Sequence, residues 1–201
     1  MGFFQWIKRL FTGAPRVPPS RPPPAVPSSA PTDLPSGMSP FPPGTGPARL
    51  IVLRHAEKSG DKHDPHLSLP GRRRAEQLVE YIPTAFGQPH FLIAARTSNR
   101  SRRPVETLEP LAAALGLEVR AKFDDDDIAA LIKALRDKQR HRGKLGVICW
   151  RHSNLPGLLE ALGAAPETVP KPWDESNYTT IIDITFPGNG EAPTKRLQMP
   201  D

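Results

Sequence analysis

The chain has 201 residues, enough for one ordinary domain and a tail, and its single cysteine, Cys149, excludes a disulfide-stapled scaffold. No apolar run approaches the ~18 residues that a membrane-spanning helix needs. The net charge is +6, from 27 Lys and Arg against 21 Asp and Glu. This charge suits phosphate, anionic lipid or nucleic acid as a ligand and by itself selects none of them.

Proline divides the chain into two parts. Half of the 26 prolines lie between Pro15 and Pro47, and neither a helix nor a sheet accepts that density. We therefore expect a proline-rich disordered linker over residues 15–48. The apolar clusters lie in residues 49–201, and we expect a single folded domain there.

The first 14 residues form a separate segment. As a helix, it places Phe3, Ile7 and Leu10 on one face, and Lys8 and Arg9 follow the apolar start. This pattern predicts peripheral contact with a membrane interface through residues 3–11. The alternative is a start that packs loosely or not at all. The single cysteine fits a reducing compartment, so we expect a cytoplasmic protein held at the inner membrane face.

From Arg49 onward, short apolar runs alternate with segments of helical periodicity. Strands are expected over residues 50–53, 91–95, 117–122, 145–150 and 179–186. Helices are expected from Leu69 after a Ser68 cap, and over residues 104–115, 124–135 and 155–162. Residues 124–127, all Asp, are expected in the first turn of the third helix, where its dipole favours carboxylates. The alternation predicts an α/β fold: three α/β/α layers with a mainly parallel sheet.

Basic residues follow three of the expected strands. Arg54 and His55 come directly after the first, Ser98 and Arg103 after the second, and Arg151, His152 and Ser153 after the fourth. Ligands of open parallel sheets bind outside the carboxyl ends of the strands. Two imidazoles and at least two guanidiniums are therefore expected at one edge, where their charge suits a phosphoryl group.

At these residues the sequence resembles the histidine phosphatase superfamily, also called the phosphoglycerate mutase-like family. Residues 50–57, with Arg54-His55-Ala56, resemble its Arg-His-Gly signature, with Ala56 in place of the glycine. Leu67 to Ala75 is similar to its Leu-Thr-x-x-Gly-x-x-Gln-Ala stretch. The remaining similar segments are Ser98 with Arg103 to Thr107, residues 147–153 and residues 177–179. The resemblance covers residues 49–201 and nothing before them.

The resemblance implies a phosphomonoester phosphatase of the metal-independent histidine acid type, without a cofactor. His55 is then the nucleophile that carries the phosphoryl group. Arg54, Arg103 and His152 hold the phosphoryl oxygens, with Ser153 beside them, and water releases phosphate. Arg100 competes with Arg103 for its role.

The proton donor to the leaving oxygen has several candidates. Glu57 lies two residues after the expected nucleophile. The other candidates are His152 itself and one of Asp124, Asp125, Asp126 and Asp127.

Other functions are less consistent with the residues. A metal site would use His63, Asp64 and His66 with His55 or His152. A nucleic-acid binder fits the charge, but the chain lacks a recognisable motif for one, so we expect no nucleic-acid partner. The stronger alternatives are a weakly active phosphate-binding module tethered by its tail, and a phosphomutase. The expected partner is a phosphorylated small molecule or phosphoprotein; the residues single out neither a substrate nor an oligomeric state.

Overall fold

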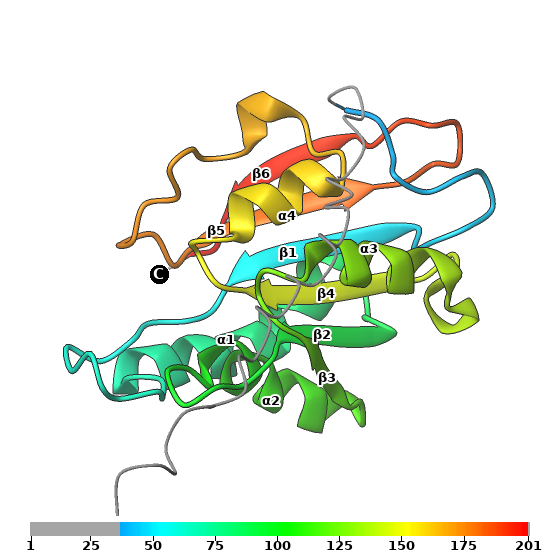
Figure 1. Ribbon diagram of the computed structural model, residues 1–201. Helices are drawn as coiled ribbons and strands as arrows, with labels where there is room; N and C mark the ends of the chain where they lie inside the picture. The colour runs from blue at the N-terminus through cyan, green and yellow to red at the C-terminus, as the bar shows by residue number, and fades with distance from the viewer. Residues whose placement is uncertain (1–36, 201) are drawn as a thin grey trace, which may run out of the picture. The chain divides into compact units, whose positions relative to one another are not determined.

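A computed structural model describes residues 37–200 (Figure 1). The expected membrane-contacting segment, residues 3–11, and the linker up to residue 36 lie outside the described residues. None of the helices between residues 37 and 200 combines the length and the apolar character that crossing a bilayer requires.

One six-stranded sheet runs through the centre of the domain. Its strands are β1 (Arg49–Arg54), β2 (Phe91–Ala95), β3 (Val119–Phe123), β4 (Leu145–Trp150), β5 (Thr180–Thr185) and β6 (Thr194–Gln198). They lie in the order β3-β2-β4-β1-β5-β6. The first four strands in this order are parallel to one another, and β5 is antiparallel to both of its neighbours, β1 and β6. The sheet is mixed and mainly parallel, as the sequence predicts.

Helices cover both faces of the sheet (Figure 1). The four helices are α1 (Leu69–Phe86), α2 (Arg103–Leu115), α3 (Ile128–Asp137) and α4 (Leu155–Ala161). Ile51 and Leu53 of β1 pack with α1 and α2, whereas Leu50 and Val52 pack with α3 and α4. Because successive strand residues point to opposite faces, one apolar strand supports both layers. The α/β/α architecture is confirmed.

Most of the expected elements are found, with three differences. The third strand ends one residue later than expected, and β6 was not expected at all. β6 lies at the edge of the sheet and exposes Lys195 and Arg196, so it lacks the apolar run by which strands are recognised. The third helix begins at Ile128, with no acidic residue in its first turn. Residues 124–127 instead form a turn before the helix, so their expected position in its first turn was wrong.

The packed part of the chain begins before residue 49. Phe41 is only 4% exposed and belongs to the larger core cluster, where its ring meets Phe186 with centroids 4.9 Å apart. Ser39 donates its backbone N–H to the carbonyl of Gly190 at 2.8 Å. The linker boundary expected at residue 48 was therefore too late, because Phe41 belongs to the core.

Removing the Phe41 ring tests this correction. We expect Phe41→Ala to lower the free energy of unfolding by about 3 kcal/mol, because a buried phenyl group is replaced by a cavity. Met38→Ala in the same segment is the control, since Met38 is 39% exposed, and its change should stay within about 0.5 kcal/mol. Urea unfolding of both variants gives the comparison. If Phe41→Ala lowered the free energy of unfolding as little as Met38→Ala is expected to, the Phe41 ring would contribute nothing to the core.

Candidate active site

The pairing of β1 with β4 brings the two candidate histidines together. Arg54 at the end of β1 is the register partner of Trp150 at the end of β4. The backbone N–H of His55 donates to the carbonyl of Trp150 at 3.1 Å. Because these strands are parallel neighbours, the residues after them emerge at the same edge of the sheet. β2 lies on the other side of β4, and the segment that follows it leads to Arg103 at the start of α2.

His55 is held as a neutral imidazole. Its side chain is 3% exposed, and Nδ1 lies 2.7 Å from the carbonyl oxygen of Ala56. Because a carbonyl only accepts, Nδ1 carries the proton and Nε2 keeps a free lone pair. Burial, reinforced by the charges of Arg54, Arg103 and His152, lowers the pKa of His55 to about 3. The free lone pair makes Nε2 a nucleophile at neutral pH.

Arg54 is a buried cation with two free donor groups. Its side chain is 1% exposed, and Nη1 donates to the carbonyl oxygens of Asp174, Glu175 and Asn177 at 3.3, 2.6 and 3.2 Å. The guanidinium carbon lies 4.0 Å from the centre of the Tyr178 ring. Nε and Nη2 are buried and have no hydrogen-bond partner within residues 37–200. Burial lowers the pKa of Arg54, although an arginine stays charged in proteins.

The second guanidinium at the site belongs to Arg103. Nη1 donates to the carbonyl of Asp64 at 2.8 Å, and the buried Nε has no partner in the described part of the chain. Arg103 also acts electrostatically on His55. Arg100 is exposed, and its backbone carbonyl accepts from Arg103 Nη2 at 3.4 Å. Of the two competitors, Arg103 is therefore the one whose charge acts on His55.

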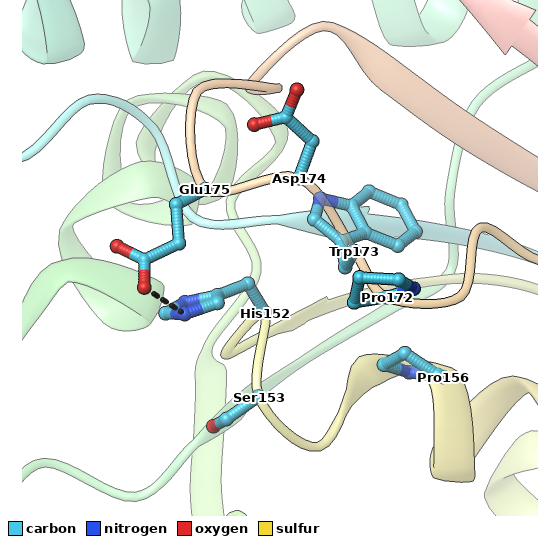
Figure 2. Close-up of a pocket in the computed structure, with 7 residues that line it drawn as sticks. All are labelled: His152, Ser153, Pro156, Pro172, Trp173, Asp174 and Glu175. Atoms are coloured by element: carbon cyan, nitrogen blue, oxygen red, sulfur yellow. Dashed lines mark ion pairs between the residues drawn. The ribbon is translucent and has the colours of Figure 1, made fainter.

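His152 and Ser153 line a pocket of about 700 Å³. Pro156, Pro172, Trp173, Asp174 and Glu175 form the rest of its wall (Figure 2). His152 Nε2 lies 3.6 Å from Oε1 of Glu175, and its Nδ1 is buried without a partner among residues 37–200. Burial lowers the pKa of His152, aided by the charge of Arg54, whereas Glu175 raises it. Arg54 and Arg103 form a cationic group around His55. His152 therefore borders both this cationic group and the pocket.

Arg151 holds a loop in place. Its Nη1 donates to the Asp125 carboxylate at 2.8 Å, and its Nη2 donates to Ser98 Oγ at 3.1 Å. Asn154 donates to the other Asp125 oxygen at 3.0 Å. These bonds tie the turn before α3 to the end of β4.

Three of the five carboxylates considered as proton donors are paired, whereas Asp126 and Asp127 are exposed. Glu57 Oε1 accepts from Arg74 Nε at 2.7 Å, and Asp124 accepts from Arg96 at 3.2 Å. Asp125 is held by Arg151 and Asn154. Each of these three would have to give up a charged partner before it could carry a proton to a leaving group.

The histidines proposed for a metal site do not come together. His66 Nδ1 lies 2.5 Å from Glu106 Oε1, and Asp64 accepts the backbone N–H of His66. Within residues 37–200 no three His, Cys, Asp or Glu side chains gather as metal ligands would.

No protein-family model matches the sequence, and no curated protein matches it. Solved structures do match the fold. A phosphoglycerate mutase from Bacillus anthracis aligns at 12% identity and TM-score 0.54, over 77% of this chain and 94% of its own. The protein histidine phosphatase SixA, complexed with tungstate, aligns at 13% identity and TM-score 0.52, over 75% of this chain and 96% of its own. The putative phosphohistidine phosphatase SixA from Agrobacterium tumefaciens aligns at 15% identity and TM-score 0.51, over 76% of this chain and 97% of its own. The chain has the histidine phosphatase fold.

Within this histidine phosphatase fold, sequence reasoning missed the contacts of two side chains near the site. Tyr178 covers Arg54, and Glu175 approaches both Lys58 and His152. Residues 174–178 precede β5, far in sequence from both histidines. Tyr178 lies in the segment 177–179, which resembles the family but predicts no contact with Arg54, and Glu175 carries no signal of its own. Only the fold reveals what these side chains touch.

The burial of neutral His55 predicts a pH-dependent stability. Burial lowers the pKa of His55 from its ordinary value of 6.5 to about 3 in the folded chain. Between these values the unfolded chain binds a proton that the folded chain does not, so stability falls as the pH decreases. We expect His55→Asn to remove up to about 1.4 kcal/mol per pH unit of this slope. Urea unfolding between pH 7 and 4 measures it; parallel slopes for the two proteins would contradict the burial of a neutral ring.

Proposed function

We propose that this protein is a phosphomonoester phosphatase that works through a phosphohistidine on His55. One observation carries the proposal: buried, unpartnered N–H groups of Arg54 and Arg103 flank a neutral imidazole in the described structure. Unsatisfied charged donors are costly in a protein interior. A phosphoryl group supplies the acceptor oxygens that would satisfy them.

The first step transfers the phosphoryl group to the protein. The lone pair on His55 Nε2 attacks phosphorus while Arg54 and Arg103 bind the phosphoryl oxygens, with His152 and Ser153 beside them. A new P–N bond forms and the P–O bond to the alcohol breaks, with the electron pair going to the leaving oxygen. The fixed guanidiniums stabilise the charge on the phosphoryl oxygens as it spreads in the transition state.

The second step returns the free protein. Water attacks phosphorus, the P–N bond breaks, and His55 Nε2 regains its lone pair. The bond from Nδ1 to the Ala56 carbonyl holds the ring in one orientation through both steps. Splitting one displacement into two is the advantage of a covalent route.

The fold by itself suits a phosphatase and a mutase alike, since both SixA and a phosphoglycerate mutase match it. The pocket beside His152 favours the phosphatase. Two of its lining residues are Asp174 and Glu175, and like charge would repel the second phosphate that a mutase must hold. The tungstate held by the matched SixA is an oxyanion of the kind that the cationic group here would bind.

The nucleophile is tested by substitution and trapping. We expect His55→Asn to lower turnover of an aryl phosphate by at least about 10³-fold, because the attacking atom is lost. His90→Asn, which changes an exposed histidine, is the matched control and should keep wild-type turnover. Brief reaction with labelled substrate should leave acid-labile phosphate on His55, identified by peptide mapping.

Two results would contradict the proposal. Full activity of His55→Asn would remove the mechanism. Tight binding of vanadate by a wild-type protein that turns over no ester would instead favour the phosphate-binding module.

A further inference from the structure

The proton for the leaving oxygen has to come from a group that borders both phosphorus and the departing alcohol. His152 has that position, because it acts electrostatically on His55 and also lines the pocket beside the site. The charge of Arg54 acts on both His152 and His55, and that of Arg103 acts on His55. The pocket walled by Pro156, Pro172 and Trp173 adjoins His152 and offers room for the alcohol.

Glu175 approaches His152 from the loop before β5. Its Oε1 lies 3.6 Å from His152 Nε2, and its Oε2 lies 3.0 Å from Lys58 Nζ. Figure 2 shows the Glu175 carboxylate turned toward the imidazole, whereas that of Asp174 points away. The Glu175 side chain is 67% exposed, so the core does not require it. Each oxygen of the Glu175 carboxylate therefore has its own partner: Lys58 for Oε2 and His152 for Oε1.

We propose that Glu175 is a positioning residue that holds His152 as the proton donor for the leaving oxygen. The inference rests on the proposed phosphatase function and adds to it. The carboxylate contacts one ring nitrogen, Nε2, and leaves the other, Nδ1, buried and without a partner within the described residues. A carboxylate that orients an imidazole, which in turn serves the reacting group, is a recurring arrangement in catalysis.

The proton balance is complete without any further group. As the P–O bond breaks, the N–H bond at Nδ1 of protonated His152 breaks too, and the proton goes to the leaving oxygen. The alcohol leaves neutral and His152 becomes neutral. In the second step His152 accepts a proton from the attacking water, so the resting state is restored.

The charges around His152 support this role. Arg54 of β1 and Lys58 of the loop after β1 disfavour its protonation, as burial does, and Glu175 favours it. Burial lowers the pKa of His152 overall, with Glu175 opposing the shift. The incoming phosphate is a further anion near the ring and favours the protonated form. Removing Glu175 should therefore lower the pKa of His152 further.

The first measurement follows His152 without using turnover. NMR titration of labelled histidine gives the pKa of His152 in the full-length protein. Glu175→Gln should lower it, and Glu175→Asp, which keeps the charge, should restore it in part. Asp174→Asn is the matched control: its carboxylate is bound by Ser176, so the pKa of His152 should not move. An unchanged pKa in Glu175→Gln would overturn the proposal.

The second measurement separates proton donation from phosphate binding. An alkyl phosphate needs a donor for its leaving oxygen, whereas an activated aryl phosphate hardly does. Glu175→Gln should lower kcat for the alkyl ester by about fivefold, the order expected for one charge–charge contact at this separation in water. Its kcat for the aryl ester should stay within about twofold. The fall in kcat/KM with rising pH should also begin at a lower pH in the variant.

Glu57→Gln is run beside it, because Glu57 is one of the proton donors that the sequence leaves open. A selective loss of alkyl-ester turnover in Glu57→Gln with none in Glu175→Gln would overturn the proposal. Equal losses on both esters in Glu175→Gln would also do so, since they indicate a role in phosphate binding. If no ester is hydrolysed and no phosphohistidine forms, the proposed function fails instead, while the titration still reports on the pair.

Discussion

Arg54 carries a full positive charge at a position that is 1% exposed, and the site is arranged around that constraint. A buried charge must be compensated or it destabilises the fold. Three carbonyl oxygens from residues 174–177 and the face of Tyr178 meet part of this need. These contacts also tie the loop before β5 to the end of β1. Two N–H-bearing nitrogens have no partner within residues 37–200, and an oxyanion has the acceptor atoms that such donors need.

The sheet supplies the rest of the geometry. β1 and β4 pair in parallel, so His55 and His152 leave the sheet side by side. β2 on the far side of β4 leads into the segment that carries Arg103. β5 runs antiparallel to β1, and therefore the loop that precedes β5 returns to the same edge. That loop brings Glu175, which no motif connects with the histidines.

The site divides its charges between two regions. Arg54 and Arg103 surround the imidazole of His55, whereas Asp174 and Glu175 line the adjoining pocket. This division of charge is our reason for proposing an ester with one phosphate and a leaving group without further negative charge. Lys58 binds the Glu175 carboxylate, so the rim is held by an ion pair as well as by the backbone. His152 lines the pocket and also acts electrostatically on His55, which is why we propose it as the proton donor.

The sequence alone determined the layered fold and the set of basic residues at the strand ends. Apolar runs such as 145–150 are buried on both faces, and Arg-His pairs directly after two of them are local patterns that need no tertiary information. The tertiary structure decided the rest. The burial of Phe41, the edge strand β6 and the pairing of Glu57 with Arg74 depend on contacts between residues far apart in sequence. The same holds for Glu175, because an exposed glutamate acquires a role only from the imidazole that the fold places beside it.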